Sequence, residues 1–551
     1  MTPRTRPVLL SAYAARTCAR AVHNDFDVTV PRPPHVVPNP HQHLLDEGVR
    51  FEEDVFARWL ALDVDVLDLR GLRGEAQVTA TLAALERGCP VVLGGRLPDD
   101  PAGARTGLPD VLVREADGSG YHPVDVKAHK TLSGEGAGAR VSTLLEPHLA
   151  YATDAAARAK ANEGDLLQLA HYWRMLQACG HQADTPWGAV VGTDAGGSQL
   201  TWFDLSQPRF TAFSRSRGKV RRSALQRYDH EHGFRVSVAR TAQGRRGAPA
   251  DPAPLVVPVG QAECATCRWA PVCVDTLPAD DLSRRLPARL SVREHLALRR
   301  AGISTVQDLA DADVAALLDS PYTAETSDVV QRERRLRTAQ VEARLTRDGA
   351  DLRLREGAVV DVPTSPVEVD LDMESSREGR VYLWGVLVTV DGTSTYTPFL
   401  DLHVDDPDSE LALAVRCFDW LAQRYPDAVV YHYSPVEKTV TRRILGGRLS
   451  AYAGTAADPA TWVDLLPTTR ASFDSRGGHG LKFVATKGAG FRWRDTDPGG
   501  AQSQLWLGQA RTGDRAAEQR VLEYNEDDVL ATLAVRRWLR SSSTAHRGEL
   551  S

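Results

Sequence analysis

The chain has 551 residues, of which 42% are hydrophobic and 25% are charged, and its formal net charge is −6. This length exceeds what one hydrophobic core can serve, so roughly two to four domains are expected. No apolar run reaches about 18 residues, which argues against a membrane span, and the first residues lack a signal-peptide pattern. No Walker-type loop is present, so no built-in ATP motor is expected. Any affinity for nucleic acid must come from local basic patches.

Seven cysteines are few for this length, and their odd number argues against a disulfide framework. The composition therefore predicts a reducing compartment, the cytoplasm. Cys264, Cys267 and Cys273 form a C-x2-C-x5-C motif that can hold one metal centre, but a closed site needs a fourth ligand. Structural zinc and an iron–sulfur cluster both remain open at this point. Four cysteines stand apart from the motif: Cys18, Cys89, Cys179 and Cys417.

The N-terminal region is predicted to contain two helices joined by a linker. The first helix carries Cys18, and the segment 28–43, which has five prolines, is predicted to be extended. Residues 43–63 repeat apolar side chains at i, i+3/i+4 and i+7, which predicts an amphipathic helix. Glu52 lies beside its apolar stripe. Either it leans into a site or it is solvated, and the helix alone favours the second interpretation.

The stretch 106–130 predicts a β-hairpin. Two β-like runs, 110–115 and 121–128, flank Asp117-Gly118, a pair of residues that suits a tight turn. Counting back from that turn places Asp110 opposite Asp125.

This register would gather charge on one face of the hairpin. Side chains alternate along a strand, so Lys127 shares a face with Asp125, while Val124 and Val126 point the other way. Paired carboxylates suit a hard divalent cation, and a nearby lysine can orient or activate water. An ordinary solvated hairpin would show the same pattern, and the hairpin alone favours that interpretation.

Three further segments complete the first half of the chain. Residues 131–163 are rich in Gly and Ala and are predicted to be a mobile insertion. A helix follows and ends at Gly180, with Gln168 and Tyr172 four residues apart on one face. Residues 209–246 carry eleven Arg or Lys against two acids, a composition that suits phosphate contacts. Four aromatic residues are interleaved there as possible stacking platforms: Phe210, Phe213, Tyr228 and Phe234.

In their order, the segments "GVRFE", "GLPD", "VDVK" and "QLAHY" resemble the RecB-like branch of the PD-(D/E)xK nucleases. The resemblance implies six catalytic residues: Glu52, Asp110, Asp125, Lys127, Gln168 and Tyr172. The three acids would bind Mg²⁺ or Mn²⁺, the lysine would help to activate water, and the Gln–Tyr pair would position DNA. Many relatives have Glu where this chain has Asp125, a change that shortens the side chain and keeps its charge.

Some RecB-like nucleases place one cysteine before the nuclease motifs and C-x2-C-x5-C after them. The cysteines of this chain resemble that arrangement, which implies a structural 4Fe-4S cluster held by Cys18, Cys264, Cys267 and Cys273. A structural zinc ion is the alternative. The other three cysteines are interpreted as inert core thiols.

Residues 275–345 are predicted to be helical. Within them, two helices joined by Ala301-Gly302-Ile303 resemble a helix-hairpin-helix, whose turn can offer backbone N–H groups to DNA phosphates. A simple packing linker would have the same pattern.

From about residue 359 the sequence predicts strands and then a long C-terminal helix. Asp372 and Glu374 alternate in one strand, and Tyr524 and Asp528 are four apart in the helix. This pattern resembles the DnaQ-like 3′–5′ exonucleases of the RNase H-like fold, in which four acids bind two divalent ions and a tyrosine orients water.

The middle acid of that pattern is ambiguous. Glu437 follows the strand that ends in "VVYHYS", and Asp464 in "WVDLLP" is the alternative. The loop 479–500 carries five side chains that we interpret as contacts for a nucleic-acid strand: Lys482, Lys487, Arg492, Trp493 and Arg494.

The chain as a whole resembles a bacterial family of RecB-like nucleases, some of which are fused to a helicase. We expect an α/β multidomain protein in three parts. These are a RecB-like restriction-endonuclease fold (a mixed sheet flanked by helices) over 1–275, a helix-hairpin-helix linker over 276–350, and an RNase H-like domain over 351–551.

The expected function is metal-dependent hydrolysis of DNA ends or single strands, in DNA repair or processing, with DNA and a separate helicase as partners and no membrane. One alternative is a nucleic-acid-binding scaffold with vestigial sites. The other places the main activity in the C-terminal domain, acting on RNA.

Overall fold

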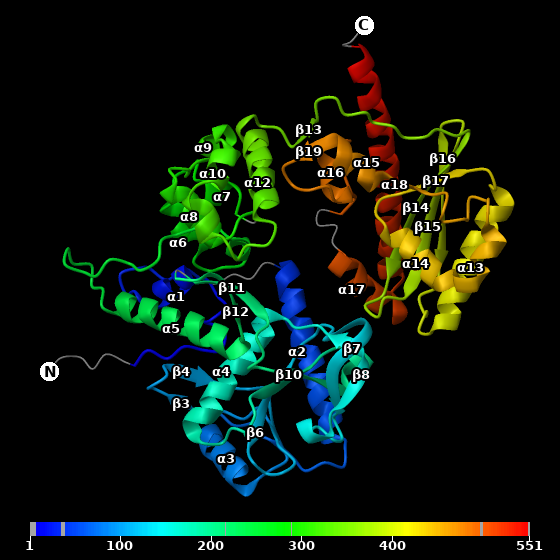
Figure 1. Cartoon of the computed structure of the whole chain (residues 1–551). Helices are drawn as coiled ribbons and strands as arrows, with labels where there is room; N and C mark the ends of the chain where they lie inside the picture. The colour runs from blue at the N-terminus through cyan, green and yellow to red at the C-terminus, as the bar shows by residue number, and fades with distance from the viewer. Residues whose placement is uncertain (1–6, 35–38, 215, 288, 496–499, 549–551) are drawn as a thin grey trace. The chain divides into compact units, whose positions relative to one another are not determined.

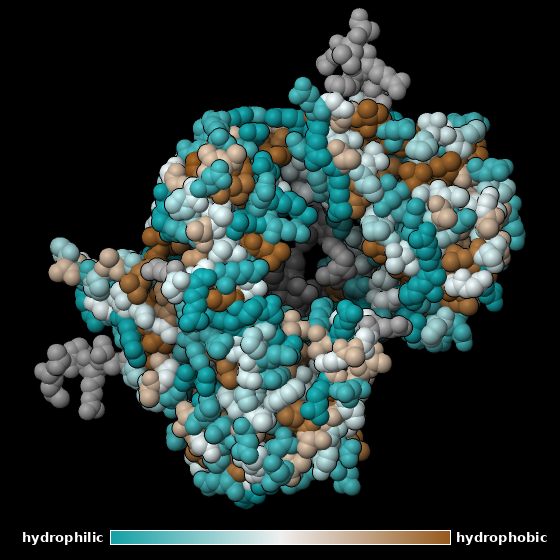
Figure 2. Space-filling model, in the orientation of Figure 1, coloured by the Kyte–Doolittle hydropathy of each residue, from teal (hydrophilic) through white to brown (hydrophobic). Residues whose placement is uncertain are grey.

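The computed structural model describes residues 7–34, 39–214, 216–287, 289–495 and 500–548 (Figure 1). The chain divides into two compact units, Met1–Thr305 with Asp313–Leu336, and Val306–Ala312 with Arg337–Ser551. In the described part of the chain, no helix has the length and apolar character to span a membrane. Hydrophilic residues cover much of the visible surface in Figure 2, and the hydrophobic ones form small separate patches.

The first unit is built on an eight-stranded mixed sheet in the order β1-β2-β5-β6-β9-β10-β7-β8. The β1/β2 and β6/β9 pairs are parallel and the others antiparallel. The strands are β1 Val66–Asp68, β2 Val91–Leu93, β5 Val111–Arg114, β6 Tyr121–Val126, β7 Leu132–Thr143, β8 Thr153–Ala159, β9 Trp187–Val191 and β10 Gln199–Asp204. Two small hairpins accompany the sheet: β3 Leu97–Asp100 with β4 Arg105–Gly107, and β11 Phe210–Ser214 with β12 Gly218–Arg222.

Helices cover both faces of this sheet. The long ones are α1 Ala19–Phe26, α2 Asn39–Leu60, α3 Gly74–Arg87, α4 Glu163–Cys179 and α5 Ala224–Gln243. Trp59 of α2 packs with Val124 and Val126, which are buried on one face. Leu169 of α4 packs with Val190 on the other. The sequence predicted a mixed sheet flanked by helices, and the structure confirms it.

The predicted register of the hairpin is confirmed. Val111 pairs with Val124 and Arg114 with Tyr121, so the same alignment places Asp110 across from Asp125. The turn contains Gly118 at φ 78°, a left-handed conformation that glycine adopts without a steric penalty.

Two predictions in this unit are wrong. The segment 131–163 is not a loose insertion, because β7 and β8 pair and extend the sheet. Its Gly and Ala residues lack the alternation of large apolar side chains by which strands are recognised. The linker predicted over 28–43 is too long, since α2 begins at Asn39, and residues 35–38 lie outside the described part. Pro40 is tolerated there because the first turn of a helix needs no donor.

The basic segment 209–246 forms β11, β12 and α5, and its Arg215 is not among the described residues. Tyr228 is fully buried, and its hydroxyl shares a hydrogen bond of 2.8 Å with His171 Nδ1. It therefore cannot be a stacking platform for bases. Phe234 is 41% exposed and remains available.

A run of helices follows, as predicted. They are α6 Ala270–Asp275, α7 Leu282–Arg285, α8 Val292–Arg300, α9 Val306–Asp311, α10 Val314–Leu318, α11 Pro321–Glu325 and α12 Arg332–Arg347. Gly302, just after α8, has φ 81°, as the predicted glycine turn requires. Whether this turn contacts DNA stays a prediction.

The second unit contains a five-stranded mixed sheet in the order β16-β15-β14-β17-β18. Its strands are β14 Val367–Ser375, β15 Val381–Val390, β16 Thr393–Leu400, β17 Val429–His432 and β18 Val463–Asp464, while β13 Leu352–Leu354 pairs with β19 Phe473–Ser475. The helices are α13 Pro407–Arg424, α14 Val436–Leu445, α15 Leu465–Ser472, α16 Leu481–Lys487, α17 Gly500–Arg511 and α18 Arg515–Gly548.

The two longest helices of this unit lie on opposite sides of its sheet (Figure 1). Leu371 of β14 packs against Phe418 of α13 in the larger core. The other face of β14 is polar and faces α18.

Candidate metal centres

One face of β14 is lined by four acids. Glu368, Asp370, Asp372 and Glu374 occupy alternate positions and therefore project toward the same side. The intervening Val369 and Leu371 are fully buried in the core on the other side. Because four like charges on one strand face repel one another, each pair needs a compensating partner.

The first pair of acids is compensated by arginines of α18. Arg536 is fully buried and binds Asp370 through two hydrogen bonds, Nε to Oδ1 at 3.0 Å and Nη2 to Oδ2 at 2.7 Å. Arg536 also pairs with Glu368, and Arg540 donates to Glu368 Oε1 at 2.6 Å. The ring of Tyr431 lies under the Arg536 guanidinium at 4.5 Å. This half of the acidic face is a closed ion-pair cluster.

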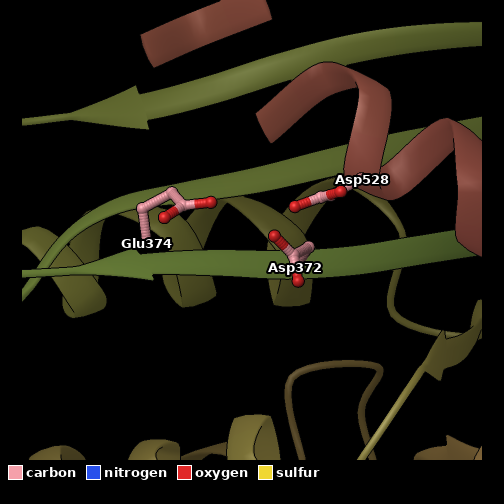
Figure 3. Close-up of side chains that lie close together, drawn as sticks. All are labelled: Asp372, Glu374 and Asp528. Atoms are coloured by element: carbon pink, nitrogen blue, oxygen red, sulfur yellow. The ribbon is translucent and has the colours of Figure 1, made fainter. Parts of the chain in front are cut away.

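The second pair of acids meets another acid instead. Asp372 and Glu374 project from β14 toward Asp528 of α18 (Figure 3). One carboxylate oxygen from each of the three lies within 4.8 Å of the others. Glu374 and Asp528 are buried and Asp372 is half-buried. Three converging carboxylates are a donor set suited to Mg²⁺ or Mn²⁺, and the negative charge that they share favours such a cation.

The pKa values reflect this crowding. Burial, and then the charge of Asp528, raise the pKa of Glu374 to about 8. Burial also raises the pKa of Asp528 to about 6, although hydrogen bonding from Trp493 opposes the shift. The pKa of Asp372 is raised by burial and by the charges of Asp528, Glu374 and Glu437. Each of the three carboxyls therefore binds its proton more tightly than a carboxyl in water does.

The comparisons with known proteins bear on this unit. Residues 369–540 match the family model described as the RNase H superfamily, and they contain the three clustered acids. This region is an RNase H-superfamily domain. No curated protein and no solved structure gave a significant match to the chain. The predicted RNase H-like fold of the C-terminal part is thereby confirmed.

The acids of the RNase H domain are held by neighbouring donors. Asn525 Nδ2 donates to Asp372 Oδ2 at 3.0 Å, and the Tyr396 hydroxyl donates to Asn525 Oδ1 at 2.8 Å. Trp493 Nε1 donates to Asp528 Oδ1 at 2.7 Å. Trp493 was predicted to contact a nucleic-acid strand, and in the structure its indole N–H orients Asp528. Asn525 was not identified from the sequence, although it directly follows Tyr524.

Tyr524 and Lys482 lie beside the same site. The Lys482 ammonium donates to the Tyr524 hydroxyl at 2.8 Å and lies 5.0 Å from the centre of its ring. The positive charge of Lys482 also lowers the pKa of Asp528. Lys482, which was predicted to contact a nucleic-acid strand, is thus a partner of Tyr524, the predicted catalytic tyrosine. Residues 496–499 of the same loop lie outside the described part.

The structure separates the two candidates for the middle acid. Glu437 is buried at the start of α14, accepts from Ser434 Oγ at 3.0 Å, and its charge acts on Asp372. Asp464 instead accepts from the backbone N–H of Ser434 at 3.1 Å and from that of Leu466 at 2.9 Å, so it caps α15. Ser434 has φ 143°, a strained conformation at the turn that presents Glu437. Of the two, Glu437 is the acid whose charge acts on Asp372.

Gly385 is required by the packing around Asn525. It pairs with Asp372 across the β14/β15 ladder, and a Cβ built on it would lie 1.8 Å from Asn525 Oδ1. Gly385→Ala is therefore expected to displace Asn525 and to lower the affinity for Mg²⁺, measured by isothermal titration calorimetry. Adding Asn525→Ala to Gly385→Ala should be no worse than Asn525→Ala alone, because the clash is then relieved. Additive losses in the double variant would contradict this account.

The raised pKa of Glu374 predicts a pH dependence. A carboxyl whose pKa is raised by folding binds its proton more tightly in the folded state, so stability falls as the pH rises. For Glu374 this window runs from 4.5 to about 8. In calorimetry with EDTA, the RNase H domain should melt at a lower temperature at about pH 8.5 than at about pH 6. Mg²⁺ should stabilise it more at the higher pH, since metal ligands must be deprotonated.

The Asp372→Asn variant provides the control for this pH dependence. It removes a carboxyl whose own pKa is raised in the folded state, so the melting temperature of this variant should change less with pH. A wild-type domain that is equally stable at both pH values without metal would contradict the assignment.

The first unit contains the second candidate centre. Lys127 Nζ lies 3.7 Å from Asp110 Oδ2 and 3.5 Å from Asp125 Oδ2. Asp110 is fixed by the backbone N–H of Val126, which donates to its Oδ2 at 2.8 Å. Asp125 is fully buried, and among the described residues its Oδ2 has no hydrogen-bond donor. The Lys127 ammonium is the cation beside that oxygen in this structure. The two aspartates suit a divalent cation, although they are less tightly gathered than the acids of the RNase H domain.

The remaining predicted residues lie around this centre. Gln168 Nε2 donates to Asp125 Oδ1 at 3.3 Å. The Tyr172 hydroxyl donates to the carbonyl of Leu108 at 3.0 Å, so it fixes the segment that leads into Asp110. Glu52 of α2 lies close enough for the charge of Asp110 to raise its pKa and that of Lys127 to lower it. The structure thus brings all six predicted residues to one corner of the sheet.

Electrostatics here resemble those of the RNase H domain. Burial raises the pKa of Asp125 to about 8, with Lys127 opposing and Asp110 adding to the shift. Burial and Asp110 raise the pKa of Glu52 to about 7. The sequence did not identify Asp165, whose charge also acts on Asp125 and which pairs with His129 at 2.9 Å. Its place in the first turn of α4, three residues before Gln168, was the available signal.

The structure describes all seven cysteines, and none of them forms a disulfide bond. Gln261 contacts two of them, with Nε2 3.2 Å from Cys18 Sγ and the backbone N 3.4 Å from Cys264 Sγ. Burial, Cys18 and other nearby groups raise the pKa of Cys273 to about 11. In the described chain no three cysteine sulfurs lie within 4.8 Å of one another, so no compact thiolate site of the zinc type is preformed. Cys417 is a fully buried core thiol, as predicted.

Proposed function

We propose that this protein is a metal-dependent nuclease. The observation that carries the proposal is the group of Asp372, Glu374 and Asp528 within an RNase H-superfamily domain. Divalent cations bound by such acids polarise the scissile phosphate and supply an activated water for phosphodiester hydrolysis.

The residues of the RNase H domain have distinct roles in this proposal. Asp372, Glu374, Asp528 and Glu437 would hold Mg²⁺ or Mn²⁺. Asn525 and Trp493 fix two of these carboxylates through single hydrogen bonds, which keeps the donor set in place before substrate arrives. Tyr524, with its hydroxyl held by Lys482, would orient the attacking water. These roles are those of a 3′–5′ exonuclease of the DnaQ-like, four-acid type.

We further propose a second nuclease centre in the first unit, of the RecB-like PD-(D/E)xK type. It is supported by the full burial of Asp125 and by Lys127, which lies between the two aspartates. Asp110, Asp125 and Glu52 would hold the metal there, and Lys127 would stabilise charge on the phosphate or the water. In this proposal the nuclease domain spans 1–275, a helix-hairpin-helix linker spans 276–350, and the second domain spans 351–551.

We also propose that Cys18, Cys264, Cys267 and Cys273 bind a structural 4Fe-4S cluster. The contacts of Gln261 with both Cys18 and Cys264 support this, since the two lie far apart in the sequence. The charges of Cys18, Cys267 and Cys264 all act on Cys273, which is consistent with four thiols that lie near one another. Anaerobically purified protein should be brown and contain iron, and Cys18→Ser should lose it while Cys417→Ser keeps it. Colourless protein with one zinc ion would contradict the proposal.

The proposed substrate is DNA, at ends or in single strands, processed during repair in the cytoplasm with a separate helicase as partner. The basic β11–β12 hairpin supports a nucleic-acid substrate, and Arg293 covers the ring of Phe213 there at 4.4 Å. RNA is the alternative substrate for the RNase H domain.

The test is digestion of end-labelled single- and double-stranded DNA and RNA by the full chain with Mg²⁺, Mn²⁺ or EDTA. We expect metal-dependent shortening of at least one DNA substrate. Binding of these substrates without turnover under any metal would instead support a nucleic-acid-binding scaffold.

A further inference from the structure

Lysines are rare in this chain, and three of them lie close together beside the sheet of the first unit. Seven of the 66 basic residues are lysines, and three of the seven are Lys127, Lys130 and Lys160. Lys160 lies next to the strand that follows Lys127, because its backbone N–H donates to the carbonyl of Thr131 at 2.7 Å. His129 lies within the electrostatic influence of Lys160. The concentration is therefore spatial as well as sequential.

Lys130 and Lys160 line a hollow of about 420 Å³ at the base of the β7–β8 hairpin. Ser133 and Gly134 of β7 form another part of its wall, and Asp194 closes it. Lys130 is three residues beyond Lys127, so the Cα atoms of these two lysines are at most ~11 Å apart. The hollow therefore begins close to the proposed catalytic lysine.

The hollow is positively charged. The acid in its wall is already engaged, because Asp194 Oδ2 accepts from the N–H of Thr131 at 2.5 Å and from that of Leu132 at 3.1 Å. The Thr131 hydroxyl also donates to it at 3.0 Å. Lys130 and Lys160 are exposed and have no ion-pair partner among the residues that the structure describes. Two ammonium groups thus face the hollow against the single carboxylate of Asp194, which leaves its lining with a net positive charge.

The backbone at Gly134 adds a second feature. The β7–β8 register shifts between Ser133 and Glu135, so Gly134 is a bulge residue without a partner in the ladder. It has φ 53° and no atom within 4 Å of a Cβ built on it, which leaves open space beside the backbone. A left-handed residue is one of the two conformations that make up an anion-binding backbone nest.

We propose that this hollow binds a phosphate group of the nucleic-acid strand on which the first-unit centre acts. This inference rests on the proposed function and names the substrate group held beside that centre. Two ammonium groups match the several oxygens of a phosphate, which can be a terminal monoester or an internal diester. A strand bound over Lys127 would have its next phosphates within reach of Lys130 and Lys160.

The first experiment measures binding of fluorescent single-stranded DNA in Ca²⁺, where turnover is not required. Lys130→Gln/Lys160→Gln should bind about tenfold more weakly than wild type and lower the salt dependence by about 0.7 per lost phosphate contact. The matched control is Arg73→Gln/Arg87→Gln, which removes the same charge at the ends of α3, near the opposite edge of the sheet. Equal affinity and salt dependence in the lysine variant and this control would overturn the proposal.

Three versions of the strand distinguish the source of the phosphate. They carry a 5′-phosphate, a 3′-phosphate or neither. A terminal-phosphate site gives a preference in wild type that the lysine variant loses, whereas an internal site weakens all three equally in the variant.

A second measurement separates this proposal from the proposed function. Reductive methylation followed by mass spectrometry can follow each of the seven lysines, with inorganic phosphate as the probe. Phosphate should protect Lys130 and Lys160 while Lys219 of β12 reacts as before. This result would support the hollow even if no oligonucleotide bound, and uniform labelling would overturn it.

Discussion

Asp372→Asn is expected to lower metal-dependent cleavage by about 10²–10³-fold, the usual loss when one electrostatic group of an active site is removed. Asparagine keeps the shape of the side chain and can still accept the hydrogen bond from Asn525, which Asp372 receives at 3.0 Å. The loss should therefore come from weaker cation binding rather than from misfolding. Steady-state cleavage of a labelled substrate, with a Mg²⁺ titration for each protein, measures both effects.

Asp125→Asn is the matched variant in the first unit. If the RNase H domain performs the measured reaction, this substitution should leave the rate close to wild type, and the reverse pattern would assign the reaction to the Asp110/Asp125 centre. Equal activity in wild type, Asp372→Asn and the doubly substituted protein would contradict the proposed nuclease function. Circular dichroism of each variant controls for folding.

Arg536→Met is expected to destabilise the RNase H domain by about 3–5 kcal/mol, because it leaves buried carboxylates without a partner. Asp370 and Arg536 are both fully buried, and they share two hydrogen bonds. Urea unfolding followed by hydrogen exchange of peptides from β14 and α18 reports on this domain alone. Similar unfolding of Arg536→Met and wild type would show that the cluster does not stabilise the fold.

Two further variants identify the cause of that loss. Arg537→Met changes the exposed neighbour on the same helix turn and should alter stability by less than about 0.5 kcal/mol. Replacing Asp370 with leucine in the Arg536→Met background should recover part of the loss, since a buried ion pair can be replaced by packed apolar groups. No recovery would point to lost packing of the Arg536 side chain instead.

Much of the architecture could be predicted because local signals agreed with one another. The turn at Asp117-Gly118 and the alternation around Asp125 determined the hairpin register, which the structure reproduces. Alternation in β14 likewise predicted that Asp372 and Glu374 share a face, and the helical spacing placed Tyr524 and Asp528 together.

Other features depended on contacts that no local pattern encodes. Asn525 reaches Asp372 only because Gly385 leaves space on the neighbouring strand. The β7–β8 strands are Gly- and Ala-rich and have the composition of a loop, yet pairing with β10 makes them part of the sheet. Tyr228 lies in a basic segment and is nevertheless core, because α5 turns it toward His171.

The charged residues of β14 and α18 are spaced by nearly the same distance along their two elements. Asp528 and Arg536 are eight residues apart, which spans ~12 Å along a helix. The acid pairs that they meet are centred four residues apart, which spans ~13 Å along a strand. The two elements run in opposite directions, so the near-equal spacings match only in one alignment. Deleting one residue between Asp528 and Arg536 would turn one set of side chains about 100° away from the strand. The metal ligands and the ion pairs therefore fix the register between this helix and this strand together, and neither could shift along the other without losing both.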